Sequence, residues 1–424
     1  MKILFQGAVI IGHNAAISNP CDILVEEGII RQIADKIDAP DAELVDCHGM
    51  VLSPGLPNLH THSPMHMLRG LAEDVAIEDW FNQQIWPYES KITEEDIYWG
   101  SMMACAEMID NGVTAFADHY FSAQTIVKAA IRSGLRLDLA VTAFGLDVEK
   151  DIADTLALRE QYQNSQTVNI RFGPHSPYLV APDSLRKLTD AAKAAGTGIH
   201  IHASETELQE QQSIEKYGKR HFQIIAEAGG FDVPCIIAHG LWANEDDFQL
   251  VGRETFVAAC PKTYLKLGAG KGLLWENWKA KNLCIGTDGA ASSNSVRPLE
   301  QAQYFALCGK WEGRAADFRA EDIWRMLMNG HNALPFGTGK IAEGAPADLV
   351  VWNLNAPATG PVYSPIASIL YSAGAQQVVH TMVAGKFLKK DGQVLLDMDE
   401  LCTNASRCAK DLYERGKGEA IVHF

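Results

Sequence analysis

A long alternation of short apolar strands with helical segments runs from Gly55 to about Lys340 and leaves few architectures open to the chain. The strand candidates include "TAFADHYF", "VNIRFGPHS", "GTGIHIHAS", "PCIIAHGLW" and "NLCIGTDGA", separated by stretches such as "PDSLRKLTDAAKAAG". Repeated strand–helix units over this length predict an α/β fold, a (β/α)8 barrel of the TIM type.

The two ends of the chain have a different sequence pattern. Residues 1–54 contain short strand patterns bounded by turn residues, and residues 341–424 return to such strands before a helical tail, "DELCTNASRCAKDLYERGKGEA". Neither end offers enough apolar surface for a core of its own. We therefore predict that 1–54 and 341–424 together form one β unit beside a barrel at 55–340.

Charge and cysteine usage limit the partners and the compartment. The formal charge of −17 argues against binding to a nucleic-acid backbone and favours a small uncharged or cationic substrate. Nine cysteines without a C-x-x-C pair indicate reduced thiols. No apolar run reaches the roughly 18 residues of a membrane span, and the N-terminus lacks a signal-peptide pattern. We expect a cytoplasmic protein without nucleic-acid or membrane partners.

Histidines and acids gather where the predicted strands end. His60 and His62 stand two residues apart, so one strand points both to the same side. Three later strands end at His202, His239 and Asp288. A strand-end aspartate alone is often a helix cap, and a strand-end histidine often bonds a loop carbonyl. At the C-terminal ends of barrel strands, however, the combined set has the residue types of a metal site.

Several motifs carry a resemblance to a known family. They are "PGLPNLHTHSPMHMLRGLAEDV", "FGPHSPYL", "IHASETELQE", "AHGLW", "LKLGAG", "GTDGAASSN" and "GKIAEGAPADLVV". The chain resembles the amidohydrolase superfamily, and within it the cytosine-deaminase-like group of methylthioadenosine/S-adenosylhomocysteine deaminases and triazine chlorohydrolases. This resemblance implies a barrel carrying a β-sandwich domain built from both termini, and it leaves a homodimer open.

The resemblance also implies a metal site. Its ligands would be His60, His62, His202 and Asp288, around one Zn²⁺ per chain, with Fe²⁺ as the alternative metal. Two-metal relatives take a bridging ligand from the fourth strand, which here has neither lysine nor glutamate, so we predict a single metal. His200 is a rival ligand on the same strand face as His202, but it lies one layer deeper in the barrel.

The implied reaction is hydrolytic deamination by a metal-bound hydroxide, with ammonia as the product. Asp288 would accept the proton of the water, Glu205 would protonate a ring nitrogen of the substrate, and His239 would orient the hydroxide or polarise the substrate. His119 and His66 are expected to line the pocket or to pack beside it.

The substrate is expected to be an amino-substituted N-heterocycle, most simply an adenosine-type nucleoside. In related deaminases the residue matching Glu89 holds ribose hydroxyls, and those matching Trp80 and His175 line the nucleoside pocket. The plainer interpretation of the segment around Glu89 is a lid helix with buried tryptophans and a solvated acid.

Two departures from the family pattern leave other substrates open. The stretch from Leu137 to Leu158 lacks the arginines that would hold a homocysteine carboxylate. The segment Ala259–Tyr264 replaces polar residues of the usual motif. A hydrolase of triazines, pterins or other aminoheterocycles, with ammonia, amine or chloride as leaving group, is therefore the alternative, and a non-catalytic assembly protein on the same fold is the third hypothesis.

Overall fold

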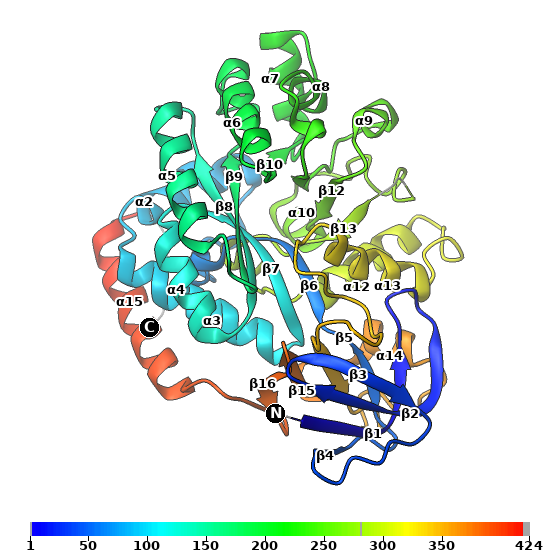
Figure 1. Ribbon diagram of the computed structural model, residues 1–424. Coiled ribbons are helices and arrows are strands. Elements are labelled where there is room, and N and C mark those ends of the chain that lie inside the picture. Colours follow the sequence, from blue (N-terminus) through cyan, green and yellow to red (C-terminus); the bar gives the residue numbers. More distant parts are fainter. Residues whose placement is uncertain (1, 280–281, 419–424) are drawn as a thin grey trace.

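The computed structural model describes residues 2–279 and 282–418 (Figure 1). Its central element is an eight-stranded parallel sheet in which the strands follow one another in chain order. The strands are β6 (Leu56–Thr61), β7 (Val113–Tyr120), β8 (Arg136–Ala143), β9 (Val168–Pro174), β10 (Ile199–Ala203), β11 (Cys235–His239), β12 (Thr255–Ala259) and β13 (Leu283–Ile285). The backbone N–H groups of Thr287 and Asp288 donate to the His60 carbonyl at 2.9 and 3.0 Å, which joins the two edges of the sheet. The predicted barrel is confirmed.

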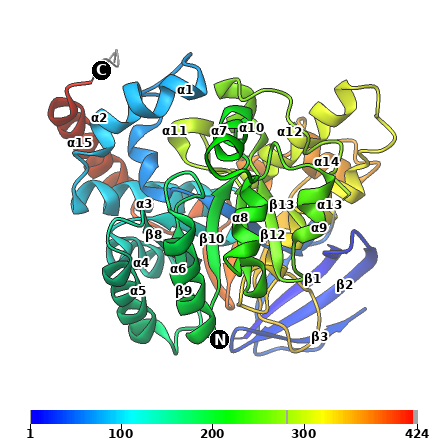
Figure 2. The same ribbon diagram turned by 90° about the horizontal axis from the view of Figure 1, so that it is seen from above.

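Helices surround the strands, as the view from above shows (Figure 2). Those between successive strands include α3 (Glu94–Asp110), α4 (Ala123–Ser133), α5 (Val148–Tyr162), α6 (Pro182–Ala194), α7 (Glu207–Tyr217), α8 (His221–Glu227), α9 (Glu245–Leu250) and α10 (Pro261–Leu267), and α12 (Pro298–Trp311) and α13 (Ala320–Met328) follow β13. Helix α4 is amphipathic, buries Ile126, Val127 and Ala130, and ends where Gly134 adopts a left-handed φ of 82°. The strands are therefore covered on both faces, which explains their continuous apolar runs.

Both ends of the chain build the second sheet, which lies below the barrel in Figure 1. Its strands are β1 (Lys2–Ile11), β2 (Ile17–Glu26), β3 (Ile29–Ala34), β4 (Glu43–Asp46), β5 (Val51–Pro54), β14 (Leu349–Trp352), β15 (Val378–Val383), β16 (Lys386–Lys390) and β17 (Gln393–Val394). Strand β5 lies between β1 and the antiparallel β14, so it joins the two ends. This sheet corresponds to the expected β-sandwich domain from both termini, while the residue limits of the domains stay a prediction.

A buried ion pair connects the barrel to this second sheet. Arg136, at the start of β8, donates from Nε and Nη2 to the Asp348 carboxylate at 2.7 and 2.9 Å. The Ala384 backbone N–H donates to the same carboxylate at 2.9 Å. Both charged side chains are buried, so the charge of each one compensates the charge of the other.

The helical tail forms α15 (Met398–Gly416), and the last residues expected in it, Glu419 and Ala420, lie outside the described residues. Helix α15 packs beside α3 and α2 (Trp86–Glu89) (Figure 1). Arg415 pairs with Asp96 at the start of α3. Among the helices of 2–279 and 282–418, none is long and apolar enough to cross a membrane.

Candidate metal centre

Four side chains converge at the C-terminal ends of the barrel strands. His60 and His62 come from β6, His202 from β10, and Asp288 from the turn after β13. The His62 Nε2 atom lies 3.3 Å from both the His202 Nε2 and the Asp288 Oδ1, and the His60 Nε2 lies 3.6 Å from that Oδ1. Tetrahedral zinc with nitrogen and oxygen ligands places neighbouring ligand atoms about 3.4 Å apart. These three spacings are therefore close to those between neighbouring ligands of a zinc ion.

Hydrogen bonds fix the imidazole rings of His62 and His202 so that the Nε2 atom of each ring can bind a metal ion. His62 donates from Nδ1 to the His119 carbonyl at 2.6 Å, and His202 donates from Nδ1 to the His175 carbonyl at 2.8 Å. A backbone carbonyl can only accept, so in both rings the proton is on Nδ1 and the Nε2 lone pair faces the centre. Metal-binding histidines are oriented in this way.

His60 has a histidine as its outer partner. Its Nδ1 lies 3.0 Å from the Nε2 of His200, and its own Nε2 is buried without a hydrogen-bond partner among the described residues. Burial lowers the pKa of His60 to about 3, so the ring is neutral at pH 7. A neutral, buried nitrogen without a partner fits a metal ligand. His200 is occupied with orienting His60, which supports His202 as the ligand of the pair.

Asp288 is held as a carboxylate. Burial alone would raise its pKa, but contact with His60 and the nearby His62 and His239 hold the pKa of Asp288 well below its usual range. Its Oδ2 accepts from Ser292 Oγ at 2.7 Å and from Thr263 Oγ1 at 3.2 Å, which turns Oδ1 toward the histidines. The Oδ2 atom of Asp288 thus accepts hydrogen bonds from the hydroxyls, and its Oδ1 atom faces the histidines.

Glu205 and His239 face the same centre. The Glu205 Oε1 lies 3.5 Å from the His239 Nε2, and Gln209 reaches the other carboxylate oxygen at 3.5 Å. His239 adopts φ 74° and Asp288 φ 60°, left-handed conformations that are uncommon outside glycine. Such strained residues cluster at functional sites, where the surrounding fold holds them.

The candidate substrate residues come from the segments that follow β6 and β9. Glu89 is 5% exposed and accepts a hydrogen bond from the Tyr120 hydroxyl at 2.6 Å, so this acid is buried rather than solvated. The His175 ring lies 4.7 Å from the His202 ring and is half-buried. Trp80 is buried in the loop that follows β6, with Phe81 6.4 Å from it.

Two further histidines occupy packing positions. The Nδ1 of His119 lies 3.0 Å from Thr142 Oγ1, and its carbonyl orients His62. His66 lies 3.7 Å from the Glu107 carboxylate. This placement agrees with the expected packing role.

Sequence reasoning missed two contacts of the centre, Tyr120 and Ser292. Tyr120 directly follows His119 at the end of β7, and this strand-end position was the available signal. Ser292 lies four residues after Asp288, one helical turn away, in α11 (Ala290–Ser293).

The segment Ala259–Tyr264, which departs from the family pattern, is held by hydrogen bonds. The Tyr264 hydroxyl accepts from the Cys260 N–H at 2.8 Å and lies 3.3 Å from the His239 carbonyl. Burial keeps the pKa of Cys260 well above its usual value, so its thiol packs rather than attacks.

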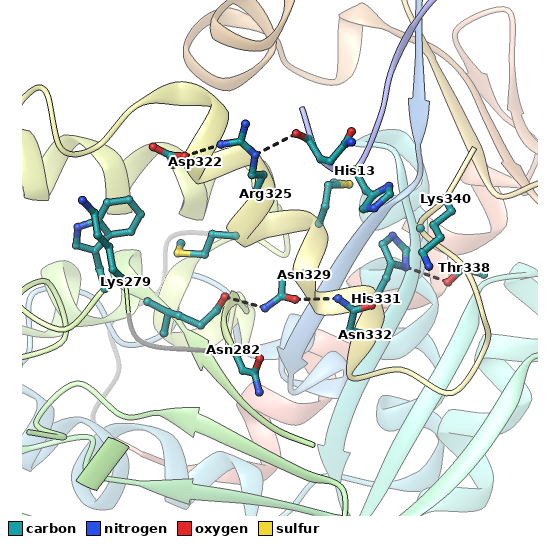
Figure 3. Close-up of a pocket in the computed structure, with 16 residues that line it drawn as sticks. His13, Lys279, Asn282, Asp322, Arg325, Asn329, His331, Asn332, Thr338 and Lys340 are labelled. Carbon is teal, nitrogen blue, oxygen red and sulfur yellow. Dashed lines mark hydrogen bonds and ion pairs between the residues drawn. The ribbon is translucent and has the colours of Figure 1, made fainter. Parts of the chain in front are cut away.

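A cavity of about 610 Å³ lies at the opposite end of the barrel, around the start of β13 (Figure 3). Its polar groups are mostly bonded to one another. Arg325 pairs with Asp322 at 2.5 Å and donates to the Asn14 carbonyl at 3.0 Å, and the His331 Nδ1 lies 2.9 Å from Thr338 Oγ1. Because barrel enzymes carry their chemistry at the other end of the strands, we place the reaction at the histidine cluster and not in this cavity.

Comparison with known proteins agrees with this geometry. The model of the Amidohydrolase family matches residues 51–388. The chain belongs to the amidohydrolase family. This amidohydrolase is 37% identical over 399 residues to a 5-methylthioadenosine/S-adenosylhomocysteine deaminase of Thermococcus sibiricus, with 91% of the chain and 93% of the relative covered. It is 32% identical over 413 residues to a 5'-deoxyadenosine deaminase of Methanoregula boonei, with 92% and 93% covered.

Solved structures resemble this amidohydrolase along most of its length. An adenosine deaminase from Xanthomonas campestris with bound zinc has a TM-score of 0.92 at 27% identity and covers 97% of this chain and 98% of its own. A triazine hydrolase variant has a TM-score of 0.88 at 20% identity, with 96% and 99% covered, a likeness of fold alone. The superfamily prediction is confirmed. The amidohydrolase is thus a hydrolytic enzyme, which sets aside the non-catalytic assembly protein.

Proposed function

We propose that the protein deaminates an adenosine-type nucleoside, such as methylthioadenosine, 5'-deoxyadenosine or adenosine, with one zinc ion per chain. The observation that carries the proposal is the close approach of the ligand atoms of His62, His202 and Asp288, with Glu205 near His239 at the same strand ends. We prefer zinc to Fe²⁺ because a protein of similar structure holds zinc and because imidazoles and carboxylates are common zinc ligands.

The side chains divide the reaction among themselves. When bound, the zinc ion makes water acidic enough to act as a nucleophile near pH 7. Asp288, a carboxylate, accepts the proton that this water loses. Glu205 gives a proton to the ring nitrogen next to the attacked carbon, because it lies beside the centre and is not needed as a ligand, and it recovers a proton from the oxygen added to that carbon. His239, 3.5 Å from Glu205, donates a hydrogen bond that orients the reacting groups. Asp288 passes its proton to the amino group, which leaves as ammonia when the C–N bond breaks.

The entrance favours a nucleoside with an apolar 5' substituent. Large apolar side chains stand exposed on the loops after β6, β8 and β9, namely Phe81, Trp86, Phe144, Leu146 and Leu179. The stretch after β8 has no arginine up to Leu158. Apolar groups of a ligand can pack on the exposed apolar side chains, whereas the carboxylate of a homocysteine would find no arginine in this stretch.

The alternative, a hydrolase of triazines, pterins or other aminoheterocycles, rests on the departure at Ala259–Tyr264. Thr263 bonds to Asp288, and Tyr264 bonds to the backbone at Cys260. This segment therefore supports the ligand Asp288. Its difference from the usual family motif is compatible with the nucleoside function.

Ammonia release tests the proposal. Zinc-loaded protein is assayed with methylthioadenosine, 5'-deoxyadenosine, adenosine, S-adenosylhomocysteine, guanine and an aminotriazine, and metal is measured on the same sample. We expect about one zinc per chain and faster release from the first three compounds than from the others. Zinc without release from any adenosine compound would discard the nucleoside, and protein that takes up no zinc would discard the metal site.

We also propose that the enzyme works in the cytoplasm on a small molecule alone, without nucleic acid or membrane, and that it forms a homodimer. All nine cysteines lie in the described ranges and none forms a disulfide, which suits a reducing compartment. Light scattering of the purified enzyme would test the dimer.

A further inference from the structure

A buried serine in a left-handed conformation directly precedes Glu205, the proposed proton carrier. Ser204 follows the last residue of β10 and has φ 52°, which residues other than glycine seldom adopt. In the part of the chain that the structure describes, the Glu205 carboxylate makes only two long contacts, at 3.5 Å with His239 and at 3.5 Å with Gln209. The direction of this carboxylate therefore depends on the backbone that carries it.

Each polar group of Ser204 has a partner. Its backbone N–H donates to the His221 Nδ1 at 3.0 Å, and its hydroxyl donates to the Glu210 Oε1 at 2.5 Å. Its carbonyl accepts from the Trp242 backbone N–H at 2.8 Å. A strained conformation persists only where the surroundings hold it, and these hydrogen bonds supply that restraint.

His221 bears an unpaired donor that a purely structural residue would avoid. Burial lowers the pKa of His221 to about 4, so the ring is neutral near pH 7. Because Nδ1 accepts from Ser204, the single proton of the ring is on Nε2. Among residues 2–279 and 282–418, this Nε2 is buried without a hydrogen-bond partner. An unpaired buried N–H is destabilising, and such departures are expected where a residue serves function.

Charged neighbours hold Glu210 from the other side. The Arg220 Nη1 lies 3.4 Å from the Glu210 Oε2, and the Arg220 Nε donates to the Asp247 carboxylate at 2.8 Å. Both acids are buried, at 3% and 1% exposure. The Glu210 carboxylate is thus fixed with its Oε1 toward Ser204.

We propose that His221 and Glu210 are positioning residues for the deamination, which hold Ser204 in its left-handed conformation and thereby direct the Glu205 carboxylate toward the substrate. This inference rests on the proposed function. Neither residue touches the substrate or transfers a proton, and both act on the reaction through Glu205.

Replacing His221 by leucine tests the proposal in the zinc-loaded enzyme. His221→Leu keeps a buried side chain and removes the acceptor of the Ser204 N–H. With the best adenosine-type substrate of the wild type, we expect kcat to fall about 10- to 100-fold, as for other small displacements of a catalytic group, while KM and zinc content stay within about twofold. His221→Asn offers a side-chain oxygen in place of Nδ1, so its kcat should stay within about threefold of the wild type.

His380→Leu is the matched control. His380 is 4% exposed in β15, and its Nδ1 accepts at 3.2 Å from the backbone N–H of Asp391, another residue with a left-handed φ, of 51°. This pair lies in the second sheet, so the change should leave kcat and KM as they are. Urea unfolding followed by circular dichroism reports the stability of both leucine variants.

The outcomes separate the positioning role from the proposed function. A loss of zinc in His221→Leu, a kcat that is unchanged there or falls equally in His380→Leu, or a kcat that His221→Asn does not restore overturns the positioning role while the deamination stands. If His221→Leu does not fold, Ser204→Ala decides, because it removes the hydroxyl that Glu210 holds. Its kcat should fall about tenfold at constant KM, and an unchanged kcat overturns the role. Wild-type enzyme that releases no ammonia from any adenosine compound overturns the proposed function, and this inference with it.

Discussion

Removing one hydroxyl behind Asp288 should weaken zinc binding without touching a ligand. Ser292 is 1% exposed and donates to the Asp288 Oδ2 at 2.7 Å, on the side of the carboxylate away from the histidines. A hydrogen bond to a charged acceptor contributes about 1.5–3 kcal/mol, which corresponds to about 10- to 100-fold in an equilibrium constant. Outer partners of metal ligands have effects of the same size on metal affinity, about 10- to 100-fold.

The structure places Ser292→Ala at the lower end of that range. Thr263 Oγ1 lies 3.2 Å from both the Asp288 Oδ2 and the Ser292 Oγ, so after the change it can turn fully toward the carboxylate. We expect Ser292→Ala to raise the dissociation constant for zinc about tenfold and the double variant with Thr263→Val to raise it about 100-fold.

Competition with a coloured chelator would measure the zinc affinity of the metal-free variants, and circular dichroism would report their folding. Ser293→Ala is the control, because Ser293 is equally buried in α11 but, within the described part of the chain, its hydroxyl bonds only to the carbonyls of Gly289 and Ser295. Equal losses of affinity in Ser292→Ala and Ser293→Ala, or an unchanged affinity in the double variant, would refute the reasoning.

Three other outcomes follow from the same geometry. Glu205→Gln should retain zinc and lose turnover, since it removes a proton carrier and no ligand; metal analysis beside an ammonia assay checks this, and loss of zinc would contradict the assignment. His202→Ala should lose most of its zinc, and a fully loaded variant would exclude His202 as a ligand. Asp348→Ala leaves Arg136 buried without its partner, so unfolding in denaturant should show a loss of about 3–5 kcal/mol, which a change below about 1 kcal/mol would disprove.

The barrel was predictable because its strands are buried on both faces and therefore read as apolar runs that end in polar residues. That His60, His62, His202 and Asp288 lie close together was predictable from their places at strand ends, since parallel strands in a barrel bring these ends together. The family resemblance then singled out these four as the ligands.

The supporting contacts were not predictable in the same way. Whether Glu89 is solvated or buried depends on how the loop after β6 folds back over β7, and no periodicity in that loop encodes the distance to Tyr120. The role of Thr263 also came from a contact with Asp288, between segments that follow the neighbouring strands β12 and β13. Packing between distant segments decides such pairs, and a strand or helix pattern does not contain it.

The sheet shared by the two ends of the chain affects how the protein is made. Strand β5 pairs with β1 soon after synthesis begins, but its other edge waits for β14, where Pro54 meets Leu349. At about 5–20 residues per second, a ribosome needs roughly 15 to 60 seconds to supply that partner. During this interval the nascent chain presents an open strand edge, which readily pairs with other chains. Its biogenesis therefore depends on keeping that edge from neighbouring nascent chains until most of the polypeptide has emerged.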